Sequence, residues 1–208
     1  MTLSAHKIYG PKGVGALYAS ETVRSWSMPA FLPTSSGGGQ EFGFRPGTEN
    51  VPGIVGLAKA TDLALRVRER EAKRVANLAG RFFGKLLERL PDLEINGFPP
   101  EGASKERPGL FAREGAPLRA PHIVNFYTPR ITAEELLFRL DREGIAASSG
   151  SACRSRSPQP SHVLRACGFS EARARKSVRV SFGRGTSQSH VDRAIEAITM
   201  ILQRKSGT

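Results

Sequence analysis

Two residues in this sequence stand in surroundings that suit covalent chemistry. Lys7 follows a histidine in SAHKIYGPKGVGALY, residues 4–18, a stretch punctuated by glycine. Cys153 lies in ASSGSACRS, residues 147–155, where the neighbouring side chains are too small and polar to pack a core. A lysine amine can form a Schiff base, and a thiolate on an accessible loop is a nucleophile. We therefore take both as candidate catalytic residues, against the simpler interpretations of a solvated lysine and a chance loop cysteine.

The neighbours of these residues bear on both candidates. Ser4 and His6 bring a hydroxyl and a ring nitrogen that can hydrogen-bond a phosphate beside the lysine. Arg154 adjoins the candidate cysteine and favours its thiolate. The other cysteine, Cys167, occurs in HVLRACGF at helical spacing with apolar residues, so we expect it to be a buried packing residue. Neither cysteine has CxxC or Cys/His ligand spacing, and we expect no metal site.

The elements that must hold these residues begin with a strand and a long helix. Residues 14–18 indicate a short buried strand, and residues 33–46 form a loop dominated by glycine. Apolar residues at i, i+3 and i+4 spacing predict helix over residues 51–90, ended by the following proline. Because Gly53 and Gly56 lower the helix propensity at its N-terminal end, we expect either two helices or one bent helix that crosses a domain boundary near residues 62 to 68.

Beyond this helix, the sequence predicts strands that alternate with helices. LEI at residues 93–95 and HIVNFY at residues 122–127 indicate strands, separated by a long Gly/Pro-rich segment that we expect to be exposed and mobile. A capping box of Thr132 and Glu135 predicts a helix that runs to Glu143 and stops at a glycine.

The last third of the chain continues in the same way. IAAS indicates a strand, residues 162–167 a short helix, SVRVSF a strand, and residues 189–203 a terminal amphipathic helix. Strands that alternate with helices predict an α/β or α+β fold.

Composition limits the classes of function. The chain has 208 residues, enough for a sizeable core, and a formal net charge of +12. Its basic residues are scattered, and no recognition motif accompanies them, so nucleic acid is not expected as the main partner. No apolar stretch suits a membrane span and no secretory signal is evident, so we expect a cytoplasmic protein.

Taken together, these stretches resemble the pyridoxal-phosphate cysteine desulfurases of the class V aminotransferase family, in the branch with a long catalytic-cysteine loop. The resemblance rests on SAHKIYGPKGVGALY, GGGQEFGFRPGTENVPGIVGLAKA, PHIVNF, SSGSACRS, PSHVLRACG and VRVSFGRGT, in the family's order. It implies a partial fold type I pyridoxal-phosphate-dependent transferase. Residues 1–62 would then be a remnant of the large cofactor domain, and residues 63–208 a complete small C-terminal α+β domain.

The resemblance also implies how the cofactor, pyridoxal 5'-phosphate, is held. Lys7 matches the family's Schiff-base lysine, which also serves as general base, and Ser4 and His6 match its phosphate ligands. Thr48, in RPGT, matches a threonine that reaches the cofactor phosphate of the neighbouring subunit, and Arg45 lies in the same loop. We therefore expect a homodimer in which the RPGT loop serves across the interface, against the alternative of an ordinary turn.

For the substrate, the resemblance implies L-cysteine. Arg179, in VRVSF, matches the arginine that holds the substrate carboxylate, and a guanidinium fork suits that group. Cys153 matches the sulfur-accepting cysteine, which takes sulfur as a persulfide and leaves alanine. The sulfur would serve iron-sulfur clusters or thiolated RNA through an acceptor or scaffold protein.

The family has about as much chain again before the Schiff-base lysine, and nothing here resembles that half. It normally supplies the aspartate at the pyridine nitrogen and the histidine stacked on the ring, so we do not expect full catalysis by this chain alone. A truncated product, a mis-assigned start and a half that works with a separately encoded N-terminal partner all stay open. Alternatives of function are a selenocysteine lyase or plain aminotransferase, and a non-catalytic dimerising or scaffold-binding module.

Overall fold

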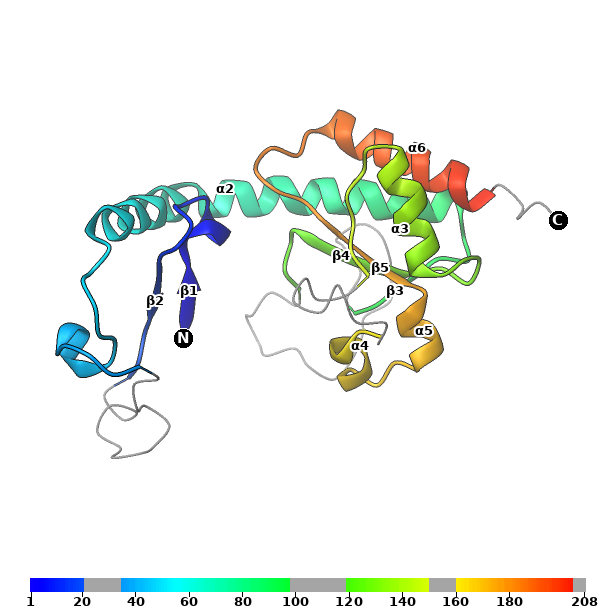
Figure 1. The fold of residues 1–208 in the computed structure, drawn as a ribbon. Coiled ribbons are helices and arrows are strands. Elements are labelled where there is room, and N and C mark those ends of the chain that lie inside the picture. The colour runs from blue at the N-terminus through cyan, green and yellow to red at the C-terminus, as the bar shows by residue number, and fades with distance from the viewer. Residues whose placement is uncertain (21–34, 98–118, 150–159, 204–208) are drawn as a thin grey trace. The chain divides into compact units, whose positions relative to one another are not determined.

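The computed structural model describes residues 1–20, 35–97, 119–149 and 160–203. They form two compact units, Met1–Glu69 and Arg70–Thr208, and one helix, α2 (Val51–Arg89), has residues in both (Figure 1). The segment expected to be mobile between the second and third predicted strands lies almost wholly outside the described residues, as does Cys153.

The first unit begins with a small hairpin. Strand β1 (Thr2–Ser4) pairs antiparallel with β2 (Gly15–Leu17), and the 3-10 helix η1 (Ala5–Ile8) lies between them. The strand predicted at residues 14–18 therefore forms, but the prediction that it is buried is wrong, because every residue of β2 is exposed. Among the described residues, β1 is its one partner strand.

Helix α2 is a single continuous element of 39 residues. The Asn50 side chain caps its start by accepting a hydrogen bond from the Gly53 amide at 3.1 Å. Neither Gly53 nor Gly56 interrupts the helix, so the two-helix alternative is wrong. The helix ends at Arg89, just before the predicted proline stop.

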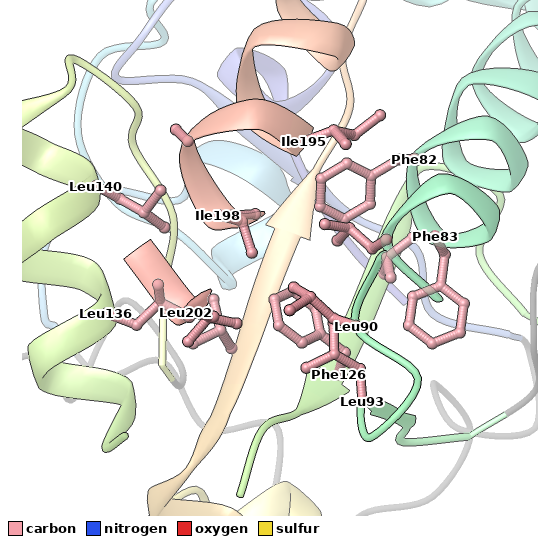
Figure 2. Close-up of a cluster of buried hydrophobic side chains, with 14 of the residues drawn as sticks. Phe82, Phe83, Leu90, Leu93, Phe126, Leu136, Leu140, Ile195, Ile198 and Leu202 are labelled. Carbon is pink, nitrogen blue, oxygen red and sulfur yellow. The ribbon is translucent and has the colours of Figure 1, made fainter. Parts of the chain in front are cut away.

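The second unit is a three-stranded antiparallel sheet in the order β3-β4-β5, formed by β3 (Glu94–Ile95), β4 (Ile123–Tyr127) and β5 (Ser177–Ser181). On one face it packs against α2, α3 (Ala133–Arg142) and α6 (Gln188–Gln203) (Figure 1). Figure 2 shows the core that results, whose labelled members are Phe82, Phe83, Leu90, Leu93, Phe126, Leu136, Leu140, Ile195, Ile198 and Leu202. The helical periodicity of residues 75–90 is thereby confirmed.

Polar contacts fix the ends of these core elements. The Thr132 hydroxyl accepts a hydrogen bond from the Glu135 amide at 3.2 Å, which confirms the predicted N-terminal cap of α3, and Gly144 ends the helix with a φ of +71°. Arg130 donates to both carboxylate oxygens of Asp92, at 2.7 and 2.8 Å, and to the Leu202 carbonyl at 3.0 Å. Arg130 thus ties the end of α6 to the turn that follows α2.

The opposite face of the sheet carries two short helices, α4 (His162–Ala166) and α5 (Glu171–Arg175) (Figure 1). The first was predicted and the second was not. IAAS does not form the predicted strand: within the described chain, its pairing with β5 is one isolated bridge between Ser148 and Arg179. A single bridge suffices to fix where this segment meets the sheet.

Candidate functional site

The predicted lysine lies on a tightly packed turn. The Ala5 amide donates to the Val14 carbonyl at 3.1 Å, and the Gly10 amide donates to the Ala5 carbonyl at 2.8 Å, while Ala5 itself is fully buried. Tyr9 closes the turn in the left-handed region, with a φ of 64°. Lys7 is thereby held on a defined backbone with its side chain exposed.

Glycine allows this turn to approach helix α2 closely. A Cβ added at Gly10 would lie 3.0 Å from the Ala60 Cβ, and one added at Gly56 would lie 2.6 Å from Cγ of Pro11. The second distance is shorter than side-chain contacts allow, so larger residues would push the turn off the helix. Gly10 of GPKGVG and Gly56 of the helix therefore both allow the lysine turn to pack closely against α2.

The groups beside the lysine are available to a ligand. Ser4 precedes η1 but its hydroxyl makes no capping hydrogen bond, and His6 is exposed. In the part of the chain that the structure describes, the side chains of Ser4, His6 and Lys7 have no hydrogen-bond partner. An exposed amine, a free hydroxyl and an imidazole on one short turn fit a ligand that carries an aldehyde and a phosphate.

The RPGT loop belongs to the same unit and is organised by Arg45. Its Nη1 donates to the carbonyls of Gly47 and Thr48, at 2.7 and 3.0 Å, and the Gly47 amide donates to Oε1 of Gln40 at 3.0 Å. Gly47 has a φ of +96°, which suits glycine alone. Thr48 is exposed at the end of this loop, and Nη1 of Arg45 is engaged in holding it.

Just before this loop, the backbone of η3 (Gln40–Gly43) is strained. Glu41, Phe42 and Gly43 are successive residues with positive φ, at 50°, 58° and 83°. Phe42, within this strained stretch, is 92% exposed.

Arg179 belongs to the second unit, on β5. It exchanges two backbone hydrogen bonds with Ser148, at 2.6 and 3.1 Å, and faces Asn125 of β4 across the sheet. Its Nε is buried and has no hydrogen-bond partner within the described residues. A buried guanidinium nitrogen without an acceptor is costly, so it marks a place where an acceptor from a ligand would be stabilised.

A polar network that includes Asn125, the cross-strand neighbour of Arg179, lies on this sheet. At its centre, Asn96 donates through Nδ2 to Oδ1 of Asn125 at 2.7 Å and to the Ser177 hydroxyl at 2.8 Å. Arg173 of α5 donates through Nε to Oδ1 of Asn96 at 2.7 Å and forms an ion pair with Glu94.

The guanidinium of Arg173 also stacks between two aromatic rings. Its central carbon lies 5.0 Å from the ring centre of Tyr127 and 4.9 Å from that of Phe169. Sequence reasoning missed this network. The one available signal was Asn125, a polar residue inside the otherwise apolar strand HIVNFY.

The two cysteines have different outcomes. Cys153 lies outside the described residues, so its role as sulfur acceptor stays a prediction. The prediction that Cys167 is buried is wrong, because the residue is exposed. Helix α4 has only five residues and buries only Leu164, and Cys167 follows it as the C-terminal cap.

The predicted site residues fall into two groups. Ser4, His6 and Lys7 lie together on one turn, with Thr48 in the same unit, whereas Arg179 lies in the second unit. Over the described ranges, no three histidine, cysteine or acidic side chains are grouped to hold a metal ion. Nor does any described helix combine the length and apolar character that crossing a membrane requires.

Comparison with known proteins identifies the family. Residues 1–194 match the model of the class-V aminotransferases. The chain belongs to the class-V aminotransferase family. Enzymes of this family use pyridoxal phosphate, which agrees with the amine, hydroxyl and imidazole of the lysine turn.

Several curated relatives of this class-V chain are named cysteine desulfurases. The chain is 42% identical to a cysteine desulfurase of Trichormus azollae over 204 residues, and 38% identical to the cysteine desulfurase IscS of Clostridium botulinum over 205 residues. These matches cover 98% and 99% of the chain but 45% and 46% of the relatives. The chain thus spans a little under half the length of the curated relatives it matches.

Solved structures agree on the fold of this class-V chain. A NifS-like protein superimposes with a TM-score of 0.73 at 30% identity, over 97% of this chain and 45% of the other. A NifS-like protein from Rickettsia africae gives 0.72 at 27% identity, over 96% and 46%. The mixed α/β fold is therefore that of part of a fold type I pyridoxal-phosphate-dependent enzyme, as the resemblance implied.

Proposed function

We propose that this chain carries the C-terminal part of a cysteine desulfurase active site. The observation that carries the proposal is Arg179, whose buried Nε lacks an acceptor in the described chain and whose backbone is paired with Ser148. Ser148 leads directly into SGSAC, so the proposed carboxylate-binding residue anchors the segment that contains the proposed sulfur acceptor. The relatives named as cysteine desulfurases match over nearly the whole chain, which supports the same assignment.

The proposed reaction balances without an external oxidant. L-cysteine and the thiol of Cys153 give L-alanine and a persulfide on Cys153: the carbon-sulfur bond of the substrate breaks, and a sulfur-sulfur bond forms on the enzyme. Arg179 binds the substrate carboxylate and orients the substrate. The thiolate of Cys153 attacks the substrate sulfur.

The lysine turn fits the cofactor role. Pyridoxal phosphate, when bound, supplies an electron sink for the substrate Cα. Lys7 would hold it covalently and would accept the Cα proton, while Ser4 and His6 would bind its phosphate. These residues are suited to the task because the turn is rigid and their side chains have no partner in the described protein.

We further propose that the RPGT loop acts across a homodimer, with Thr48 directed to the cofactor phosphate of the other subunit. The exposed ring of Phe42 and the exposed apolar side chains at the start of α2 support an interface here. Phe42→Ser should shift the sedimentation of the protein toward the monomer, and an unchanged dimer would count against this interface. The proposed acceptor or scaffold protein rests on the family resemblance.

The proposed function can be tested by supplying the remainder of the fold. The chain is co-expressed with the N-terminal half of the Trichormus azollae relative, loaded with pyridoxal phosphate and given L-cysteine. We expect alanine in proportion to sulfide when a reducing thiol is present, and a mass increase of one sulfur atom on Cys153 when it is absent. Lys7→Ala should lose the visible absorption of covalently bound cofactor, whereas Cys153→Ser should keep that absorption and lose the persulfide.

Two results would contradict the proposal. The first is an assembly that binds the cofactor through Lys7 but yields no alanine. The second is a persulfide on Cys167 with Cys153 unmodified. Because Cys167 is exposed, Cys167→Ser is the matched control, and it should leave the yield of alanine unchanged.

A further inference from the structure

Asn125, the cross-strand neighbour of Arg179, belongs to the kind of antiparallel pair in which side chains lie closest. Arg179 uses both its backbone amide and its carbonyl on Ser148. In an antiparallel ladder these two groups lie on the same side of the strand, so the pair that Arg179 makes with Asn125 on the other side is a non-hydrogen-bonded pair. Such pairs bring the Cα atoms to about 4.5 Å and their side chains into contact range.

The orientation of the Asn96 amide is fixed by its partners. Arg173 can only donate, so the Asn96 atom that it contacts at 2.7 Å must be the oxygen. Nδ2 of Asn96 therefore faces Asn125 and Ser177. The Ser177 hydroxyl donates its proton to the Arg173 carbonyl at 2.7 Å, so it accepts from Asn96, as the geometry requires.

The orientation of Asn125 follows from that of Asn96. Its atom facing Nδ2 of Asn96, at 2.7 Å, must be an acceptor, which is Oδ1. Nδ2 of Asn125 is left over, and among the described residues it has no hydrogen-bond partner. The sheet thus presents two side-chain donors without acceptors next to each other, Nδ2 of Asn125 and the guanidinium of Arg179 with its buried Nε.

We propose that Asn125 is a second carboxylate-binding residue, which donates from Nδ2 to the same substrate carboxylate as Arg179, and that Asn96 is its positioning residue. The inference rests on the proposed function for the identity of the substrate. Its chemistry is that of an anion held by one charged fork and the NH₂ group of one neutral amide, which both donate, while the amide oxygen already accepts from Asn96. This arrangement favours a carboxylate over an amide or alcohol, because their donor protons would find no acceptor there.

A binding experiment on the whole chain tests the pair without requiring catalysis. The ¹⁵N-labelled chain is titrated with 3-mercaptopropionate, which is cysteine without its amine, and separately with 2-mercaptoethanol, which lacks the carboxylate. We expect the side-chain resonances of Arg179 Nε and Asn125 Nδ2 to shift with one common Kd for the acid, and neither to shift with the alcohol.

Variants separate binding from positioning. Asn125→Ala should weaken binding of 3-mercaptopropionate about tenfold or more, as expected for a hydrogen bond to a charged group. Asn125→Asp, of the same shape, should weaken it further because it replaces a donor by a negative acceptor. Tyr127→Phe, on the same strand and face, keeps the ring beside Arg173 and is the matched control with unchanged affinity. Asn96→Ala should weaken binding, but the double variant of Asn96 and Asn125 should be no weaker than Asn125→Ala, since Asn96 acts through Asn125.

The outcomes distinguish this inference from the proposed function. It is overturned if Arg179 shifts without Asn125, if neither shifts, or if Asn125→Ala keeps the Kd of the parent chain. In the assembled enzyme, the inference is also overturned if Asn125→Ala leaves the KM for L-cysteine unchanged. Production of alanine in that assembly would still support the proposed function. If the assembly makes no alanine and the acid still shifts both residues, the carboxylate pair stands and the desulfurase proposal fails.

Discussion

Replacing Arg173 by methionine should destabilise the second unit far more than the same replacement of Arg139, an arginine in a local ion pair. The side chain is only 22% exposed. Methionine would remove the hydrogen bonds to Asn96 and to the Ile95 carbonyl, the latter at 3.2 Å, and would leave Oδ1 of Asn96 without its donor. A hydrogen bond from a charged donor contributes about 1.5–3 kcal/mol, and stacking on each ring adds about 0.5–1 kcal/mol.

These contributions are not additive, and the ion pair with Glu94 adds less than about 1 kcal/mol because that carboxylate is largely exposed. We therefore expect Arg173→Met to lower the free energy of unfolding by about 3 kcal/mol. Arg173→Lys keeps the charge but loses the fork, and should lower it by about 1–2 kcal/mol.

Urea denaturation followed by circular dichroism measures the loss, with Arg139→Met as control. Arg139 lies in the same unit, and its ion pair is with Glu135 one helical turn away. Pairs of this kind contribute about 0.5 kcal/mol or less. If Arg173→Met were within about 1 kcal/mol of Arg139→Met, the network would not stabilise the sheet and our reasoning would be refuted.

Three further predictions concern the core, the ion pair and the lysine turn. Phe82→Ala, at a fully buried position between two other phenylalanines, should destabilise the protein by about 3–5 kcal/mol in urea, and a loss under 1 kcal/mol would contradict the described packing. The hydrogen bonds from Arg130 hold the pKa of Asp92 below its usual range, so this pair stabilises the fold above about pH 4 and the effect is lost as the pH falls through the lower folded value. At neutral pH the free energy of unfolding of the parent protein should exceed that of Asp92→Asn by under about 1 kcal/mol, since the pair is partly exposed. This difference should decrease as the pH falls, and an increase would contradict the reasoning. Gly56→Ala improves helix propensity but collides with the proline of the lysine turn, so hydrogen exchange of the Ala5 amide should quicken, and unchanged exchange would mean that the turn does not depend on this contact.

The sequence allowed much of the second unit to be predicted, because its signals are local. The apolar spacing of residues 75–90 and the capping box at Thr132 each act within one or two turns, and both elements formed as expected. Predictions failed where the outcome depended on tertiary partners. Residues 14–18 look like a buried strand, but burial requires a second layer, and the strand that forms there, β2, is exposed in the described chain.

Cys167 and the surroundings of Arg179 show the same limit. The helical spacing in HVLRACGF implied that Cys167 would pack in the core. The helix instead ends at Ala166, one residue before Cys167, and Leu164 is its one buried residue. Ser4, His6 and Lys7 could be placed together because they are adjacent in sequence. The neighbours of Arg179 could not, since Asn125 and Ser148 meet it only through the register of β4 with β5 and one isolated bridge.

The network around Asn96 also has a consequence for the chemical ageing of the protein. Asn96 is followed by Gly97, and an asparagine before glycine is prone to deamidation, in which the next backbone nitrogen attacks the side-chain carbonyl carbon. Here both ends of the Asn96 amide are held, the oxygen by Arg173 and the nitrogen by Asn125 and Ser177, so the rotation needed for that attack is restrained. If Asn96 did deamidate, the new carboxylate would have no proton to give to Oδ1 of Asn125 and would repel it. The folded sheet therefore protects a labile residue, and storage under conditions that loosen the sheet would expose Asn96 to deamidation next to the proposed carboxylate site.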